Sequence, residues 1–313
     1  MSRSIYVLLG EKSHTPTLNF YYTYRIQICL CISGNFCDTQ MFFYMPVASP
    51  SPTRYNERKK EVTIMARLLE VCVDSLDSAR AAIAGGADRL ELCSALIAGG
   101  LTPYTQLLKQ IRAQSNIPVR CLMRPRAGDF LYTPEEIALM AAQIHELKAS
   151  GADGFVIGCL TPEGELDEQA MSPLLEAAAG TSLTLHRCID VSRDPAKTYL
   201  DAMKLGFDTV LTSGAAVSCT AGLETIEQLL ALRDLHNGPE VLVGAGVNAR
   251  VISAFLAKAP QTRAFHMSGK IEKESGMRFR REGVPMGLPG LDEWHNPQTS
   301  RENIQAAREA LDA

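Results

Sequence analysis

The sequence lacks the features that identify several large classes of protein. No apolar run approaches the roughly 18 residues of a membrane-spanning helix. No block of like charge is long enough to indicate a nucleic-acid or strong membrane-surface partner, and the formal net charge is only −4 over 313 residues. We therefore predict a protein with neither a nucleic-acid nor a membrane partner.

Several common catalytic and metal-binding motifs are also missing. The chain contains no GxSxG, Walker or HExxH motif and no C-x2-C…H-x3-H spacing of a structural zinc site. Its nine cysteines form no CxxC pair, and six of them lie in or beside predicted strands. This pattern indicates reduced thiols in a cytoplasmic protein, and not a secreted disulfide framework.

Residues 1–64 differ in character from the rest of the chain. Aromatic residues and three cysteines, Cys29, Cys31 and Cys37, crowd one segment without clear periodicity, and the polar segment SPSPTRYNERKKE follows. The apolar run at 26–32 is too short and too late for a signal peptide. We predict an extension outside the folded domain. Either translation begins at Met65 and the upstream segment is a gene-model artefact, or the segment is a disordered or organelle-targeting extension.

Residues 68–103 are the stretch around which the rest is organised. Two short apolar runs flank a helical segment, and each run carries a glutamate followed two residues later by a cysteine: Glu70 with Cys72, and Glu91 with Cys93. Side chains alternate along a strand, so each glutamate shares a face with its cysteine. Because strands of a parallel sheet are buried on both faces, these carboxylates predict a wet or ligand-occupied space.

From Met65 onward the pattern is regular. Three segments repeat a glycine that ends a helix, an aspartate in the turn and a β-rich run. Eight strands are predicted, over 68–73, 89–93, 119–123, 154–159, 183–188, 209–212, 240–243 and 264–267. Alternation with helices over about 250 residues predicts a single (β/α)8 TIM barrel in residues 65–313. The rival fold, a doubly wound open sheet, is disfavoured because no GxGxxG follows the first strand.

Several helix boundaries are visible in the sequence. Thr133 opens a helix with a proline and a capping box, and Asp194 opens another in the same way. Asn248 and Ser300 are predicted N-caps of two later helices. The segment 283–298, rich in glycine and proline, is predicted as a long loop.

The active face of such a barrel lies at the carboxyl ends of its strands. The predicted strand ends carry the following residues: Glu70, Cys72, Asp74, Glu91, Cys93, Ser94, Arg124, Arg126, Asp129, Gly158, Cys159, His186, Arg187, Asp190, Thr212, Ser213, Gly244, Gly246, Ser268, Gly269 and Lys270. Catalytic candidates among them are Glu70, Glu91, Arg124 and His186. In the alternative, the glutamates form interior salt bridges with Arg124 or Arg187 and only fill the barrel.

Two further sites are predicted at the same face. Gly244, Gly246, Ser268 and Gly269 end the last two strands, where barrels often bind phosphate through backbone N–H groups; the alternative is that the glycines only permit tight turns. Cys72 and Cys93 end adjacent strands, and two thiolates suit Cu(I). The alternative for these cysteines is simple packing. His145 and His236 are predicted to be surface residues.

Eight stretches resemble the CutC family of copper homeostasis proteins. They are EVCVDS (70–75), GADRLELCSALIAGGLTP (86–103), MRPRAGDFLYT (123–133), GADGFVIGCLTPEGELD (151–167), TLHRCIDVSRDP (184–195), VLTSG (210–214), VGAGV (243–247) and SGMRFR (275–280). The resemblance covers residues 65 to about 287 and none of residues 1–64. At 186–190 the chain has HRCID where the family more often has HRAFD, and HMSGK (266–270) departs from the usual HxSA ending.

The resemblance implies a (β/α)8 barrel in the cytoplasm with a role in copper handling. It also implies Cu(I) binding at the cysteines of EVCVDS and ELCS, which are Cys72 and Cys93. Two functions follow: a protein that binds and buffers Cu(I), or an enzyme that acts on an anionic or phosphorylated small metabolite with Glu70 and Glu91 as acid/base groups. The sequence does not decide between them. A homodimer is compatible with this fold, although no apolar stripe in the sequence indicates one.

Overall fold

The computed structural model describes residues 30–32, 35–37, 67–284, 286 and 292–313. β1 (Leu30–Ile32) and β2 (Asn35–Cys37) form an antiparallel pair within the first compact unit of the chain. The other elements belong to the second unit, which spans Thr63–Ala313. Apart from β1 and β2, the predictions made for residues 1–64 concern residues outside the described part.

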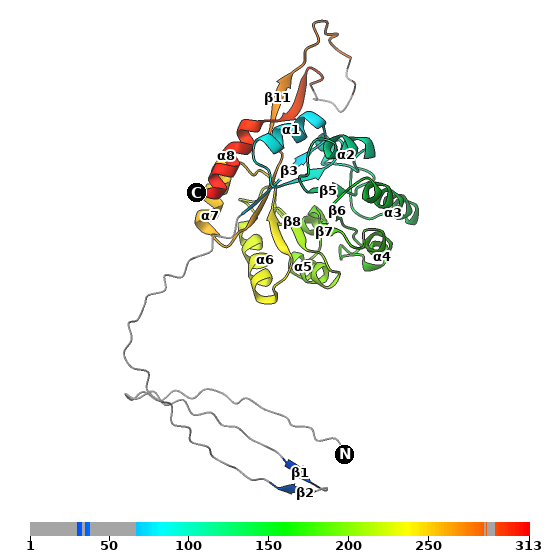
Figure 1. Ribbon diagram of the computed structural model, residues 1–313, viewed down its shortest axis with the longest axis vertical. Helices are drawn as coiled ribbons and strands as arrows, with labels where there is room; N and C mark the ends of the chain where they lie inside the picture. The colour runs from blue at the N-terminus through cyan, green and yellow to red at the C-terminus, as the bar shows by residue number, and fades with distance from the viewer. Residues whose placement is uncertain (1–29, 33–34, 38–66, 285, 287–291) are drawn as a thin grey trace, which may run out of the picture. The chain divides into compact units, whose positions relative to one another are not determined.

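Eight parallel strands close into a barrel, which confirms the predicted fold (Figure 1). In chain order they are β3 (Leu68–Val73), β4 (Arg89–Leu92), β5 (Val119–Leu122), β6 (Gly154–Ile157), β7 (Ser182–Leu185), β8 (Thr209–Thr212), β9 (Glu240–Val243) and β10 (Ala264–Met267). Pairing of β10 with both β9 and β3 closes the sheet. Several predicted strands extend past the observed carboxyl ends. The extra residues are outside the hydrogen-bonded ladder and begin the loops that carry the candidate site.

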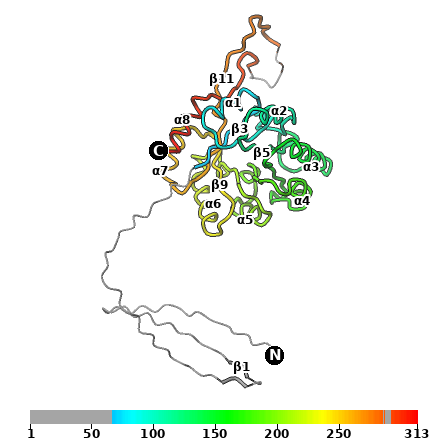
Figure 2. The backbone as a smooth tube through the Cα atoms, in the orientation of Figure 1, coloured from blue at the N-terminus to red at the C-terminus, as the bar shows by residue number. Residues whose placement is uncertain are grey.

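Helices surround the strands, as the tube view shows (Figure 2). They are α1 (Leu76–Ala84), α2 (Thr105–Arg112), α3 (Pro134–Ala149), α4 (Glu168–Ala177), α5 (Pro195–Lys204), α6 (Leu223–His236), α7 (Ala249–Lys258) and α8 (Arg301–Asp312), with short 3-10 helices η1 (Leu96–Ala98) and η2 (Arg187–Val191). The predicted N-caps Thr133, Asp194, Asn248 and Ser300 all accept backbone hydrogen bonds from the first turn of their helices. In the part of the chain that the structure describes, no helix is long and apolar enough to cross a membrane.

The predicted loop over 283–298 is partly wrong. β12 (His295–Thr299) pairs antiparallel with β11 (Lys270–Glu274), from Lys270 opposite Thr299 to Glu274 opposite His295. Neither strand is apolar, and β12 contains Pro297, so local propensity disfavours the element. It forms because β11 continues directly from the last barrel strand and offers it a pairing edge.

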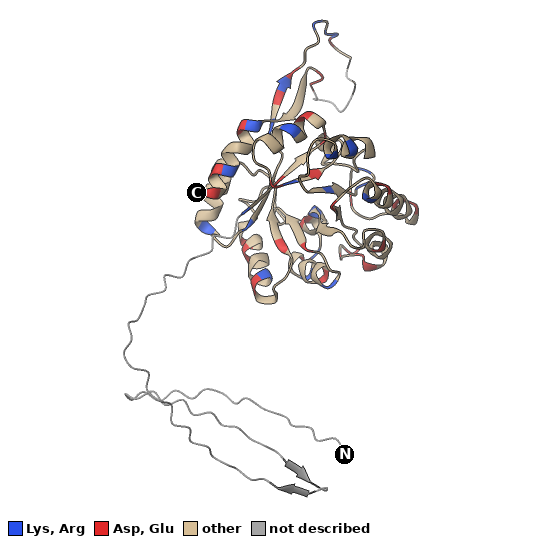
Figure 3. Cartoon of the chain, in the orientation of Figure 1, with Lys and Arg blue, Asp and Glu red and all other residues tan. Residues whose placement is uncertain are grey.

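Charged residues lie mainly on the outer helices, but a few lie on barrel strands (Figure 3). Four charged residues on these strands are buried, namely Glu70, Arg89, Glu91 and Arg120. The guanidinium of Arg120 donates to the hydroxyls of Thr184 and Thr209 and is paired with Asp208. The barrel interior is therefore polar through part of its length, as the glutamate pattern predicts.

Candidate functional site

The strand register brings five titratable side chains together inside the barrel. Glu70 on β3 is level with Arg89 on β4 and with His266 on β10. Two residues further along both strands, Cys72 on β3 is level with Glu91 on β4. Residues two apart on a strand face the same way, so these side chains meet in the interior near the carboxyl ends of the strands.

The sulfur of Cys72, a carboxylate oxygen of Glu91 and a ring nitrogen of His266 lie within 4.8 Å of one another. The other contacts of His266 orient its ring: Nδ1 is 2.8 Å from Glu70 Oε1, and Nε2 is 3.7 Å from Glu91 Oε2. With Nδ1 occupied by Glu70, Nε2 is the nitrogen available beside Cys72 and Glu91. We call Cys72, Glu91 and His266 the mouth triad.

Glu70 is the fully buried partner that holds this arrangement together. Its carboxylate accepts from Arg89 Nε at 2.5 Å and contacts His266 through its other oxygen. Burial opposes ionisation, but Arg89 and His266 outweigh it and lower the pKa of Glu70 to about 2. Glu70 is therefore an ionised counter-ion, and its position behind His266 is typical of the outer partner of a ligating histidine.

The pKa values of two residues of the mouth triad, Glu91 and His266, are shifted. Burial, reinforced by the charge of Glu70, raises the pKa of Glu91 above its ordinary value. Burial alone would lower the pKa of His266, but Cys72, Glu91 and Glu70 raise it well above its ordinary value. Two carboxylates in one site with oppositely shifted pKa values are a common symptom of a functional centre.

Cys93 lies beside the triad. Its thiol donates to Glu91 Oε2 at 3.5 Å, and burial raises its pKa well above the ordinary value. Cys72 and Cys93 belong to one small buried apolar cluster with Leu122 and Val156. The two predicted metal ligands are thus close together, but the structure adds His266 and Glu91 to Cys72 as the tightest group of ligand atoms.

The predicted arginine partners of the glutamates are wrong. Arg124 donates instead to backbone carbonyls of Ala98, Gly100 and Gly128, while Arg187 pairs with Asp190 in its own loop. Both lie beyond the strand ends, whereas Glu70 is deeper and is level with Arg89. The interior salt bridge exists, as the alternative interpretation predicts, but with a different arginine.

His186 lies apart from the glutamates. It is buried at the end of β7, its Nδ1 accepts the N–H of Cys188, and its ring is 4.6 Å from that of Phe130. Burial and the charge of Arg124 lower its pKa to about 3. Its imidazole is therefore neutral, and it does not join the mouth triad.

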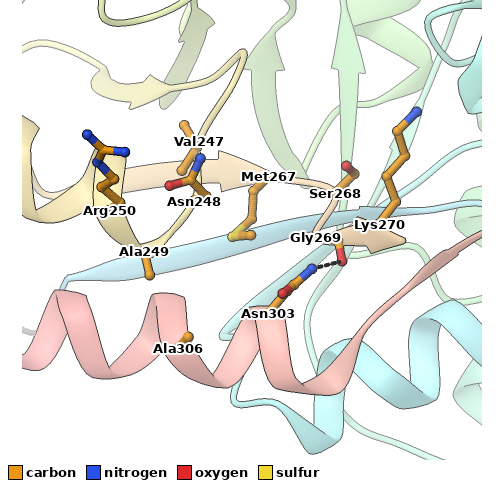
Figure 4. A pocket seen from close by; sticks show the side chains of 10 residues that line it. All are labelled: Val247, Asn248, Ala249, Arg250, Met267, Ser268, Gly269, Lys270, Asn303 and Ala306. Carbon is orange, nitrogen blue, oxygen red and sulfur yellow. Dashed lines mark hydrogen bonds between the residues drawn. The ribbon is translucent and has the colours of Figure 1, made fainter. Parts of the chain in front are cut away.

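Two of the four predicted anion-site residues line a cavity. Ser268 and Gly269 border a space of about 290 Å³ next to the first turns of α7 and α8, together with Arg250, Lys270 and Asn303 among others (Figure 4). Asn303 donates to the carbonyl of Gly269, which ties α8 to this wall. Gly244 and Gly246 are not part of the lining.

Sequence reasoning missed His266 and Arg89. The sequence contains a signal for both in the alternation of side chains along a strand. Arg89 is two residues before Glu91 on β4, and His266 on β10 is two residues before Ser268, which follows that strand. Residues two apart on a barrel strand point the same way, so Arg89 shares its inward face with Glu91. His145 and His236 are exposed, as predicted.

The chain is similar to proteins of one family. The model of the CutC family matches residues 67–271. A CutC family protein of Chromobacterium violaceum is 39% identical over 249 residues, which cover 79% of this chain and 99% of that protein. A human protein named copper homeostasis protein cutC homolog is 40% identical over 220 residues, which cover 70% of this chain and 80% of the human protein.

A solved structure from the same family is also similar to this chain. The crystal structure of a CutC protein from Streptococcus agalactiae superimposes with a TM-score of 0.60 at 27% identity. The match covers 64% of this chain and 98% of the bacterial chain. The barrel unit of this chain therefore accounts for nearly the whole length of that relative.

Proposed function

Because the chain belongs to the CutC family, we propose that it is a copper homeostasis protein that binds and buffers Cu(I) in the cytoplasm. The observation that carries the proposal is the mouth triad, in which sulfur, imidazole nitrogen and carboxylate oxygen lie within 4.8 Å of one another. The cytoplasmic location is supported by the six cysteines of the barrel unit, all of which are free thiols. The homodimer stays a prediction.

The donor set fits Cu(I) in part. Thiolate is a soft ligand that selects Cu(I), and imidazole also suits copper, so Cys72 and His266 would hold the ion. Cys93 packs in the same small buried cluster as Cys72 but is not among the ligand atoms of the mouth triad, so it would supply a second sulfur only by losing its proton and moving toward them. The carboxylate of Glu91 is a harder donor, and its contact with Cys93 suits it better to accept that proton. Binding therefore competes with protons held on the ligands.

The proposal is tested by anaerobic competition for Cu(I) against a chelator of known affinity, with the full-length protein. Cys72→Ser and His266→Gln are each expected to raise the Kd for Cu(I) at least about tenfold, since each removes a proposed ligand. Cys219→Ala is the matched control, because Cys219 is also a buried free thiol but is not in the mouth triad. It should bind as the parent does.

Parent-like affinity in either ligand variant would remove that residue from the site, and parent-like affinity in both would refute the proposal. Zn²⁺ should be titrated in parallel, because one sulfur, one nitrogen and one oxygen ligand also suit zinc. A preference for Zn²⁺ that is lost in Cys72→Ser would keep the site but contradict copper as its metal.

A second candidate function is favoured by the split between the two carboxylates. With the pKa of Glu70 lowered to about 2 and that of Glu91 raised, Glu91 is the group suited to general acid/base chemistry. The sequence predicts both Glu70 and Glu91 as acid/base groups. We keep only Glu91 in that role, because both oxygens of Glu70 are engaged by Arg89 and His266. In this function the chain acts on an anionic metabolite.

The cavity at Ser268 provides the test of that candidate. Arg250 and Lys270 bring positive charge to its lining, where a phosphate group would also meet the first backbone N–H groups of α7. Inorganic phosphate is expected to raise the Tm of the parent and not that of Arg250→Ser/Lys270→Ser, with sulfate-free chloride at equal ionic strength as control. An equal rise in both proteins would exclude this cavity as the anion site.

A further inference from the structure

A second group of polar side chains, whose donor atoms are buried, lies at the carboxyl ends of β5 and β7 and on the loop after β5. Five buried side-chain nitrogen or oxygen atoms have no hydrogen-bond partner among the described residues, and three belong to this group: Arg124 Nε, Tyr132 Oη and His186 Nε2. Phe130 lies between two of them, with its ring centre 5.3 Å from Arg124 Cζ and 4.6 Å from the His186 ring. We call these four residues the Phe130 cluster.

The unpartnered atoms of the Phe130 cluster are held in place by their neighbours. Backbone carbonyls from two loops accept three of the four terminal N–H groups of Arg124, which fixes its guanidinium and leaves Nε without a partner. The N–H of Cys188 donates to His186 Nδ1 at 3.1 Å. The side chain of Tyr132 is buried among the core residues of the barrel, although its hydroxyl has no partner.

The protonation state makes all three atoms donors. His186 is neutral because burial and Arg124 lower its pKa, and with Nδ1 accepting a hydrogen bond the proton is on Nε2. An arginine Nε can only donate, and burial raises the pKa of Tyr132 well above its ordinary value, so its hydroxyl keeps its hydrogen. Buried donors without an acceptor destabilise a folded protein, because each has lost its hydrogen bond to water and gained none. The group lacks an acceptor, and a metal ion cannot supply one.

We propose that the Phe130 cluster binds the carboxylate group of a small metabolite, with Arg124 Nε, Tyr132 Oη and His186 Nε2 donating hydrogen bonds to its oxygens. The positive charge of Arg124 matches a carboxylate, and the ring of Phe130 provides an apolar surface for the attached carbon chain. Phosphate fits less well, because most of the terminal N–H groups of Arg124 are already engaged. The second guanidinium beside the cluster, that of Arg126 at 5.3 Å from the Tyr132 ring, is paired with Asp129 and Glu136. The inference is independent of copper binding at the mouth triad.

Tyr132→Phe is the decisive variant. It removes one unpartnered hydroxyl without changing the shape of the ring, so the free protein should be as stable as the parent or more stable. If the cluster binds a carboxylate, the same change should weaken that binding at least about tenfold, because a hydrogen bond to a charged acceptor is lost. Tyr104→Phe is the matched control, since Tyr104 is 74% exposed.

The measurement is the NMR signal of the His186 ring in the full-length protein labelled with 15N-histidine. The chain has six histidines, and His186→Asn assigns the signal. Acetate and succinate are the probes, with chloride at equal ionic strength. We expect a saturable shift of the Nε2–H signal with at least one carboxylate, weakened in Tyr132→Phe and retained in Tyr104→Phe.

Two results would overturn the proposal. One is a His186 signal that neither carboxylate changes, as expected if only buried water satisfies these donors. The other is a shift of equal size with chloride or in Tyr132→Phe, which would locate the ion elsewhere. A Tm measurement on the same samples should agree, with a carboxylate-dependent rise in the parent and in Tyr104→Phe only.

Discussion

Replacing Glu70 by Gln should destabilise the protein by about 3–5 kcal/mol, a large part of the stability of an ordinary domain. The carboxylate is fully buried and is the counter-ion of both Arg89 and His266. Without it, two buried cationic groups lose their partner, and the amide cannot neutralise either. Denaturant unfolding of the metal-free protein near pH 7 gives the free energy of unfolding directly.

Glu91→Gln is the natural comparison, and it should change the free energy of unfolding by about 1 kcal/mol or less. The pKa of Glu91 is already raised, so a neutral amide resembles the state that burial favours. Glu274→Gln, at an exposed ion pair with Arg280, should have a similarly small effect. A loss below about 1 kcal/mol in Glu70→Gln would show that the barrel does not depend on this carboxylate.

The second large effect is a pH dependence caused by His186. The unfolded state takes up a proton below about pH 6.5, but the folded state does not until about pH 3, because the buried imidazole has its pKa lowered to about 3. Stability is therefore fully present above pH 6.5 and falls as the pH is lowered through this window. The stability lost through His186, relative to neutral pH, is about 2 kcal/mol at pH 5 and about 4 to 5 kcal/mol by pH 3.

Unfolding free energies of the parent and of His186→Asn, measured between about pH 7.5 and pH 5, isolate the pH-dependent contribution of His186 to stability. Other groups titrate in both proteins, so the difference in slope belongs to His186. His186→Asn is expected to lose less stability over this range, even if it is less stable at pH 7.5. Parallel curves would contradict a buried neutral imidazole.

Local signals in the sequence predicted the elements well, and for a physical reason. The helix starts at Thr133, Asp194, Asn248 and Ser300 depend on hydrogen bonds to residues two or three positions away, so the sequence contains both partners. The strand count depends on apolar runs and on the glycines that end helices. β12 was missed because its partner is more than twenty residues away and neither strand is apolar.

The sequence by itself determined the (β/α)8 alternation, the family resemblance and the presence of acidic and thiol side chains on the first two barrel strands. Only the tertiary structure decided their partners. Glu70 pairs with Arg89 because β3 and β4 are staggered by the shear of the closed barrel, and His266 reaches Cys72 and Glu91 because β10 closes the sheet against β3. His266 is 196 residues from Glu70 in the chain, and no local pattern specifies such a contact. The site is therefore a property of barrel closure, whereas the strands that carry it are a property of the sequence.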